Sequence, residues 1–140
     1  MITNIVIIDD SQYKVDTIEG YMQKIFPKAK IDKLEAINTG IMFIRNNLAE
    51  IRQNPNHWLV VSDMVMPRYK HEMPERKGGE FVIREINRLD LECPVILQSS
   101  DELDTNKYKE YYSYLLGTIK ETSVVYNLEK YRELLKNYII

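Results

Sequence analysis

The sequence has little cysteine, no long apolar run and almost no excess charge. Its single cysteine, Cys93, cannot form a disulfide within the chain, so nothing indicates an oxidising compartment. The first residues, MITNIVIIDD, lack the basic segment and long apolar stretch of a secretory signal or membrane span. A formal net charge of -2 gives no electrostatic argument for nucleic acid as a main partner. We therefore expect a cytoplasmic protein that binds neither nucleic acid nor a membrane.

What the chain does have is the size and composition of one globular domain. It has 140 residues, of which 44% are hydrophobic and 29% charged, which is enough for a substantial core. It has no internal repeats, low-complexity tracts or linkers. We therefore expect a single domain over residues 1–140.

Apolar runs alternate with helical periodicity along the chain. Short apolar runs predict five strands, at residues 5–8, 31–36, 58–61, 94–97 and 114–119. Apolar residues at helical spacing predict four helices, near 15–25, 41–51 (capped by Asn38 or Thr39), 80–89 and 125–135. A polar stretch over 101–112 is expected to form a fifth helix. This alternation indicates an α/β fold, with a parallel sheet covered by helices on both faces. The segment RYKHEMPERKGG, at 68–79, is polar and is expected to be a loop.

Polar side chains follow four of the five predicted strands. They are Asp9 and Asp10, Asp63, Ser99 and Ser100, and Lys120. Because the carboxyl ends of parallel strands meet at one edge, where such sheets bind ligands, we expect these side chains to lie together. The apolar run WLVVSD ends in a carboxylate, and burying an uncompensated charge is costly. The sequence therefore predicts a functional site at this edge.

The predicted site suits phosphoryl chemistry. Three neighbouring carboxylates repel one another unless a cation binds or some of them are protonated. Oxygen ligands without a nearby histidine or cysteine favour Mg²⁺. A carboxylate can itself act as a nucleophile and form an aspartyl phosphate, with a lysine and serine hydroxyls to contact the phosphoryl group.

Four motifs in sequence order, IVIIDD, DMVMP, VILQSS and LLGTIK, resemble those of a response-regulator receiver domain. The resemblance covers essentially the whole chain apart from an insertion at about 68–79. It implies a flavodoxin-like doubly wound (βα)5 fold with a five-stranded parallel sheet in the order 2-1-3-4-5. It also implies a histidine kinase or phosphotransfer protein as phosphoryl donor, and an output face formed by strand four, helix four, strand five and helix five.

The resemblance also assigns roles to the acidic residues. Asp63 would be the phosphoacceptor and a ligand of Mg²⁺. Asp10 would bind the metal directly, and Asp9 would assist, through water or otherwise. The backbone carbonyl of Val65 would complete the protein ligands. No other cofactor is implied.

At the other strand ends, Ser99 would bond to the phosphoryl group and Lys120 would contact the phosphate. Two positions depart from the family pattern. Gly117 stands three residues before the lysine, where receivers often have an aromatic switch residue. Glu121 follows the lysine where proline is common. Both departures bear on how a phosphorylation signal would be passed on.

The position two residues after the acceptor is also informative. Val65 cannot orient an attacking water by hydrogen bonding, so we expect a long-lived phosphoryl group. It also argues against a haloacid-dehalogenase-type enzyme, which would need a second aspartate there. We therefore expect a phosphoacceptor and not an enzyme with a separate substrate.

Several alternatives stay open at this stage. The chain stops after its last predicted helix, so the expectation is a receiver without an output domain, acting through an unknown downstream protein. The alternative is a degenerate receiver that acts as a phosphorylation-independent interaction module. The insertion could be a partner surface or a flap over the site, or merely a tolerated lengthening of a surface loop. Some of these residues could have a structural role instead of a functional one. Asp9, Asp10, Ser99 or Ser100 could cap helices. His57 and His71 are expected at the surface, and packing is expected for Cys93, Tyr111, Tyr112 and Tyr114.

Overall fold

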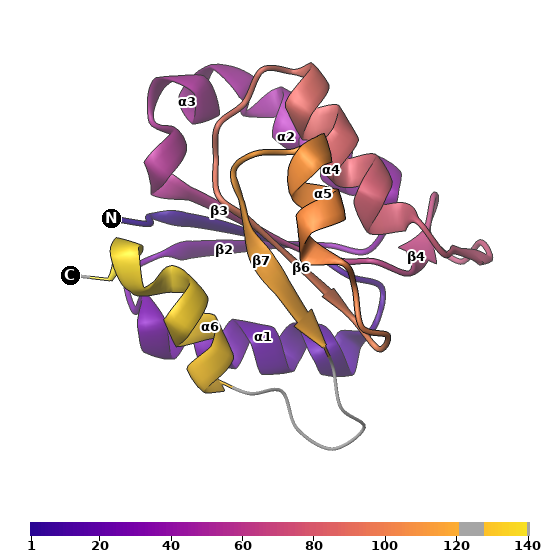
Figure 1. Cartoon of the computed structure of the whole chain (residues 1–140), viewed down its shortest axis with the longest axis horizontal. Helices are drawn as coiled ribbons and strands as arrows, with labels where there is room; N and C mark the ends of the chain where they lie inside the picture. Colours follow the sequence, from indigo (N-terminus) through magenta and orange to yellow (C-terminus); the bar gives the residue numbers. More distant parts are fainter. Residues whose placement is uncertain (121–127, 140) are drawn as a thin grey trace.

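Five parallel strands run through the centre of the molecule in the order β2-β1-β3-β6-β7 (Figure 1). The computed structural model describes residues 1–120 and 128–139. The strands are β1 (Asn4–Ile8), β2 (Lys30–Leu34), β3 (Trp58–Asp63), β6 (Val95–Ser99) and β7 (Leu115–Lys120). Counting only these five strands, the order is 2-1-3-4-5, which confirms the predicted doubly wound parallel sheet.

Helices cover both faces of this sheet (Figure 1). One face carries α1 (Gln12–Ile25) and α6 (Leu128–Leu135). The other carries α2 (Ile37–Asn46), α3 (Leu48–Gln53), α4 (Gly78–Arg88) and α5 (Thr105–Tyr111). Two short 3-10 turns, η1 (Pro55–His57) and η2 (Lys136–Tyr138), precede β3 and follow α6.

The core has two layers because alternate residues of each strand point to opposite faces. In β1, Ile5 and Ile7 belong to the layer under α1 and α6, whereas Val6 and Ile8 belong to the layer under α2 and α4. All four are fully buried. Burial on both faces explains why the strands read as continuous apolar runs instead of alternating patterns.

The second and fourth helical regions differ from their predicted boundaries. The predicted helix over 41–51 is two helices, α2 and α3, separated at Asn47, whose side-chain amide donates to the Phe43 carbonyl oxygen (2.8 Å). α2 begins at Ile37, so neither Asn38 nor Thr39 is its N-cap. The Thr39 hydroxyl instead accepts from the Ala36 N–H (3.2 Å).

The helix predicted from residue 101 begins later, at Thr105. Its N-cap is Asp104, whose side chain accepts a hydrogen bond from the Lys107 N–H (3.3 Å). Ser99 and Ser100 therefore do not cap this helix. In the closing helix, Leu128, Leu134 and Leu135 lie in α6, as does Tyr131, whereas the predicted position of Val125 lies outside the described residues.

The segment 68–79 was expected to be a loop, and this is partly wrong. Residues on either side of its tip form a short antiparallel hairpin, β4 (Met66–Pro67) with β5 (Pro74–Glu75). His71 lies between these strands with a φ of 71°, in the left-handed region. Sequence patterns did not reveal these strands, because a strand of two residues has no detectable period.

The helix after this hairpin begins at Gly78, earlier than the predicted residue 80. A Cβ atom on Gly79 would lie 2.8 Å from the carbonyl oxygen of Asp63. On Gly78, it would lie 3.1 Å from the carbonyl oxygen of Met64. The glycine pair thus lets the start of α4 approach the end of β3 closely. In the described part of the chain, no helix is both long and apolar enough to cross a membrane.

Candidate functional site

The carboxyl ends of β1 and β3 bring three acids together. Asp9 and Asp10 directly follow β1, and Asp63 is the last residue of β3. One carboxylate oxygen from each lies within 4.8 Å of the others. Asp9 and Asp63 are buried, whereas Asp10 is exposed. The predicted acidic cluster therefore forms, with one member open to solvent.

Backbone and side-chain donors hold Asp9 in place. Its Oδ1 accepts from the Ser11 N–H (2.9 Å), and its Oδ2 accepts from Nε2 of Gln98 (3.1 Å). Ser11 itself is the N-cap of α1, and its hydroxyl oxygen accepts a hydrogen bond from the backbone N–H of Lys14 (3.5 Å). Since Ser11 is the cap, neither Asp9 nor Asp10 takes the helix-capping role considered from the sequence.

A lysine that was not among the predicted site residues lies in the cluster. Nζ of Lys14 is 2.6 Å from Oδ2 of Asp63 and 3.5 Å from Oδ2 of Asp9. Lys14 belongs to the first turn of α1, directly after the cap. Searching only strand ends overlooks it, but a helix that starts at the sheet edge places its first-turn side chains over that edge. A lysine three residues after a helix cap and four after an acidic pair was the available signal.

Ser99 and Lys120 lie at the same edge of the sheet, as predicted. They are the last residues of β6 and β7 and are partners in the register of those strands. Ser99 is buried, and its Oγ accepts from the Asp101 N–H (3.2 Å). Lys120 is exposed. Within residues 1–120 and 128–139, Asp63 forms an ion pair with Lys14 and not with Lys120. The roles assigned to Ser99, Lys120 and Val65 stay predictions.

A buried amide connects the acidic cluster to α6. Gln98 donates through Nε2 to Asp9 and accepts through Oε1 from the hydroxyl of Tyr131 (2.6 Å). Gln98 and Tyr131 are both fully buried. The sequence motif VILQSS contains this glutamine, but only its serines were predicted to be functional. A glutamine inside an otherwise apolar strand was the signal, because buried polar groups need partners.

Gly117 on β7 has a packing explanation. A Cβ atom there would lie 2.8 Å from Cδ2 of Leu134 on α6, closer than such atoms approach in real structures. An aromatic side chain at this position would therefore require the partly buried Leu134 side chain to move aside. Beside it, the hydroxyl of Thr118 is 2.6 Å from that of Thr105 at the start of α5.

The hairpin within the insertion lies at the rim of the acidic cluster. Asp10 shares a hollow of about 120 Å³ with hairpin residues that include Lys70, His71 and Glu72. Lys70 also forms an ion pair with Glu35 after β2 (3.0 Å). The insertion therefore borders the site, while its role as a flap or partner surface stays a prediction. His57 and His71 are exposed, as expected from the sequence.

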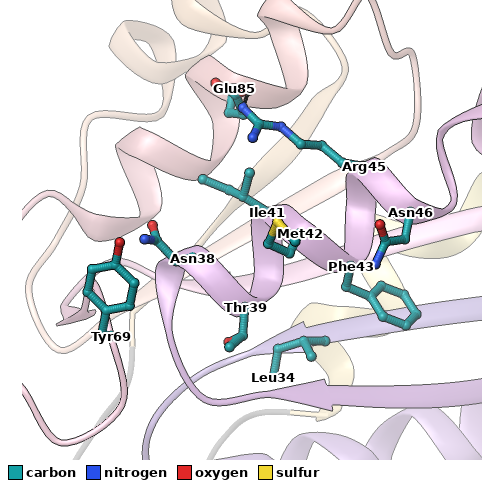
Figure 2. A pocket seen from close by; sticks show the side chains of 10 residues that line it. All are labelled: Leu34, Asn38, Thr39, Ile41, Met42, Phe43, Arg45, Asn46, Tyr69 and Glu85. Atoms are coloured by element: carbon teal, nitrogen blue, oxygen red, sulfur yellow. Dashed lines mark hydrogen bonds and ion pairs between the residues drawn. The ribbon is translucent and has the colours of Figure 1, made fainter.

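A larger hollow than the one at the hairpin lies elsewhere, over α2 (Figure 2). It measures about 680 Å³, and none of the three clustered acids lines it. Figure 2 shows Arg45 reaching from α2 towards Glu85 of α4, with which it pairs at 2.5 Å. Hydrogen bonding to Arg88, with a further contribution from Arg45, lowers the pKa of Glu85 to about 2. This charged pair joins α2 to α4 and is not part of the acidic cluster.

No family model matches the chain, and no curated protein matches it. Solved receiver domains do. A chain of the CheX–CheY–BeF3–Mg²⁺ complex from Borrelia burgdorferi is 15% identical over 99% of this chain and 90% of its own, with a TM-score of 0.72. A response-regulator receiver domain from Clostridium thermocellum is 18% identical over 99% and 94%, with a TM-score of 0.68.

A third similar structure is the receiver domain of the histidine kinase CKI1 from Arabidopsis thaliana, complexed with Mg²⁺ and BeF3⁻. It is 14% identical over 96% of this chain and 90% of its own, with a TM-score of 0.63. The fold is therefore that of response-regulator receiver domains, as the resemblance of the sequence motifs implied. At these identities the likeness establishes the fold, and the function has to be argued from the site.

The residues of the acidic cluster fit Mg²⁺. All three side chains offer carboxylate oxygens, which are the donors that this hard cation prefers, and their oxygens lie close enough together to share an ion. Two of the acids are buried, so their charges need compensation by a cation. The exposed Asp10 leaves one side of the cluster open to solvent, from which an ion can arrive.

Proposed function

We propose that this protein is a response-regulator receiver in which Asp63 accepts a phosphoryl group from a histidine kinase or phosphotransfer protein. The observation that carries the proposal is the convergence of Asp9, Asp10, Asp63, Ser99 and Lys120 at the carboxyl edge of a receiver-type sheet. The five residues come from four strand ends or the turns after them, and together they supply a nucleophile, metal ligands, a hydroxyl and an amine.

In the proposed reaction, a carboxylate oxygen of Asp63 attacks the phosphorus of a phosphohistidine. An O–P bond forms, the P–N bond breaks, and the electron pair leaves with the imidazole nitrogen, giving an aspartyl phosphate. Bound Mg²⁺ would supply positive charge for the oxygens of the phosphoryl group. The Ser99 Oγ accepts from the Asp101 N–H, which leaves its own hydrogen to donate to a phosphoryl oxygen. Lys120 at the next strand end would contact another of these oxygens.

In this proposed role, the protein assists its own phosphorylation and turns over no separate substrate. Its output is a changed binding face for another protein, as in receivers generally. Since Leu134 fills the space beside Gly117, that change would not depend on an aromatic side chain on β7. Gln98, which contacts both Asp9 and Tyr131, is the buried connection from the cluster to α6.

A second candidate is a receiver that is never phosphorylated and serves as an interaction module. The observation that favours it is the ion pair of Lys14 with Asp63, since this contact compensates the acceptor charge without a metal. The two candidates differ in one respect that can be measured. Only the first requires that Mg²⁺ and a phosphoryl group bind at the cluster.

Beryllofluoride, a mimic of the phosphoryl group, provides the test. Amide NMR with Mg²⁺ and beryllofluoride should give saturable shifts at Asp63, Ser99 and Lys120 in the wild type. Asp63→Asn should abolish them, whereas the control Asp90→Asn, at the opposite end of α4, should retain them. Failure of the wild type to respond at saturating Mg²⁺ would exclude the phosphoacceptor and leave the interaction module.

A further inference from the structure

A side chain of the protein itself places a positive charge inside the acidic cluster. Nζ of Lys14 lies 2.6 Å from Oδ2 of Asp63, the distance of a charge-assisted hydrogen bond, and 3.5 Å from Oδ2 of Asp9. The two carboxylates are almost inaccessible, at 4% and 0% side-chain exposure, whereas the Lys14 side chain is 18% exposed. The ammonium group therefore sits between two buried anions and solvent.

The chain trace fixes this placement. β1 ends at Ile8, Asp9 and Asp10 follow, and Ser11 caps α1. Lys14 then falls in the first helical turn, over the carboxyl edge of the sheet. Its backbone position is fixed by the helix start and not by a flexible loop, so the ammonium group can reach Asp63 at the end of its side chain.

An ammonium group and Mg²⁺ cannot both use these oxygens. Mg²⁺ binds its carboxylate oxygens directly, at about 2.0–2.1 Å, and requires near-octahedral surroundings with several waters. Lys14 already donates to Oδ2 of Asp63 and approaches Oδ2 of Asp9. A second cation at these two acids would also repel the ammonium group. Metal binding therefore requires that Lys14 move away, and its flexible four-carbon stem, partly exposed already, permits this.

We propose that Lys14 is a built-in counter-ion that competes with Mg²⁺ for Asp63 and Asp9 and sets the Mg²⁺ concentration at which the cluster is loaded. This inference rests on the proposed function in so far as it assumes a metal site at the cluster. It adds a regulatory residue that acts by occupying the acceptor. With Lys14 in place, Asp63 is charge-compensated, and with Lys14 displaced, Asp63 and the metal are available together.

The test is titration with Mg²⁺ alone by isothermal calorimetry. Hydrogen bonds to charged groups contribute enough that Lys14→Met should bind Mg²⁺ about 10- to 100-fold more tightly than the wild type. Lys14→Arg keeps the positive charge and should stay near the wild-type affinity. The control is Lys33→Met. Lys33 lines a hollow of about 190 Å³ with Asp9 and Asp10 but pairs with Glu19 (3.2 Å), so its loss should change the affinity by no more than about twofold.

A measurement on the wild type guards against a variant that fails to fold. The ¹³Cε resonance of Lys14 should shift with Mg²⁺ over the same concentration range as the amide of Asp63, because the ammonium group leaves as the metal arrives. A Lys14 resonance that stays constant while the cluster saturates would overturn the inference. Equal Mg²⁺ affinities of the wild type and Lys14→Met would overturn it as well.

The outcomes separate this inference from the proposed function. If both proteins bind Mg²⁺ equally and respond to beryllofluoride, the counter-ion role fails and the phosphoacceptor stands. If Lys14→Met binds Mg²⁺ more tightly but neither protein responds to beryllofluoride, the counter-ion role stands and the phosphoacceptor fails. Absence of Mg²⁺ binding in both proteins would overturn both.

Discussion

The hydroxyl of Tyr131 donates a hydrogen bond of 2.6 Å to Oε1 of Gln98, and both side chains are fully buried. Because Gln98 also donates to Asp9, one continuous polar chain runs from the acidic cluster to α6. Among the described residues, every buried side-chain nitrogen and oxygen has a partner. A fully satisfied chain of this kind is sensitive to the loss of any one member, since the remaining partner stays buried and unpaired.

Replacing Tyr131 with phenylalanine should therefore destabilise the protein. The variant keeps the aromatic ring but leaves Oε1 of Gln98 without this donor, at an expected cost of about 1–3 kcal/mol. Urea denaturation of the variant and the wild type measures it. Tyr114→Phe is the matched control, because the Tyr114 hydroxyl bonds to Glu92 in an exposed position (2.9 Å), and its loss should cost less than about 0.5 kcal/mol. Equal stabilities of the two variants would contradict this account.

Gly117 should accept a small side chain only if Leu134 moves. Gly117→Ala places a Cβ atom 2.8 Å from Cδ2 of Leu134, and because this side chain is only partly buried and can shift, we expect a cost below about 1 kcal/mol. In the double variant with Leu134→Ala, the added Cβ no longer meets the leucine side chain. The loss of stability should therefore be smaller than the sum of the losses in the two single variants. In the control Gly20→Ala, the added Cβ meets nothing within 4 Å inside α1 and should raise stability by about 0.5–1 kcal/mol. Thermal denaturation compares the wild type, Gly117→Ala, Leu134→Ala, the double variant and Gly20→Ala.

The thiol of Cys93 should be unreactive in the folded protein. Burial raises its pKa to about 11, so little thiolate exists near neutral pH, and the side chain is fully buried. A chromogenic disulfide reagent at pH 8 should react only after urea unfolds the chain. Ser100→Cys, which adds an exposed thiol, should react at once with one equivalent. Rapid reaction of the wild-type thiol would show that the Cys93 site opens readily.

The pair between Glu85 and its arginines should stabilise the protein only above a certain pH. The pKa of Glu85 in the folded protein is about 2, against an ordinary value of 4.5, so folding favours the ionised carboxylate. Its contribution is fully present above pH 4.5 and is lost as the pH falls towards 2. Because the pair is largely solvent-screened, we expect Glu85→Gln to cost less than about 1 kcal/mol at pH 7. The difference from the wild type should fade as the pH falls towards 2.

If Asp63 is phosphorylated, the phosphoryl group should be lost slowly. Val65 offers no hydrogen bond to orient an attacking water, so Val65→Asn should accelerate loss of a phosphate label, by roughly 10-fold. Val65→Ala is the control and should leave the rate near that of the wild type. A wild-type label that disappears within seconds would contradict the expectation.

The sheet and its functional edge could be predicted from the sequence because two regular signals coincide there. Continuous apolar runs such as IVII mark buried parallel strands, and polar residues such as Asp63 and Lys120 mark their ends. The carboxyl ends of parallel strands lie at one edge of the sheet. The sequence could therefore place these polar residues at the same edge without any knowledge of side-chain conformation.

Features that depend on side-chain reach could not be predicted in this way. Lys14 enters the cluster from a helix, and its contact with Asp63 depends on the residue at which that helix starts. The division at Asn47 depends on a side-chain bond to the Phe43 carbonyl oxygen, which competes with continued helix. Gln98 was overlooked because its partner Tyr131 lies in a helix far along the chain.

The close contact between Gly117 and Leu134 also restricts how this sequence can change over evolution. An aromatic residue gained at position 117 would require the partly buried side chain of Leu134 to move aside. Shortening Leu134 first would remove its packing beside β7, which is itself destabilising. The residues acceptable at positions 117 and 134 therefore depend on each other, and we expect the two positions to change together.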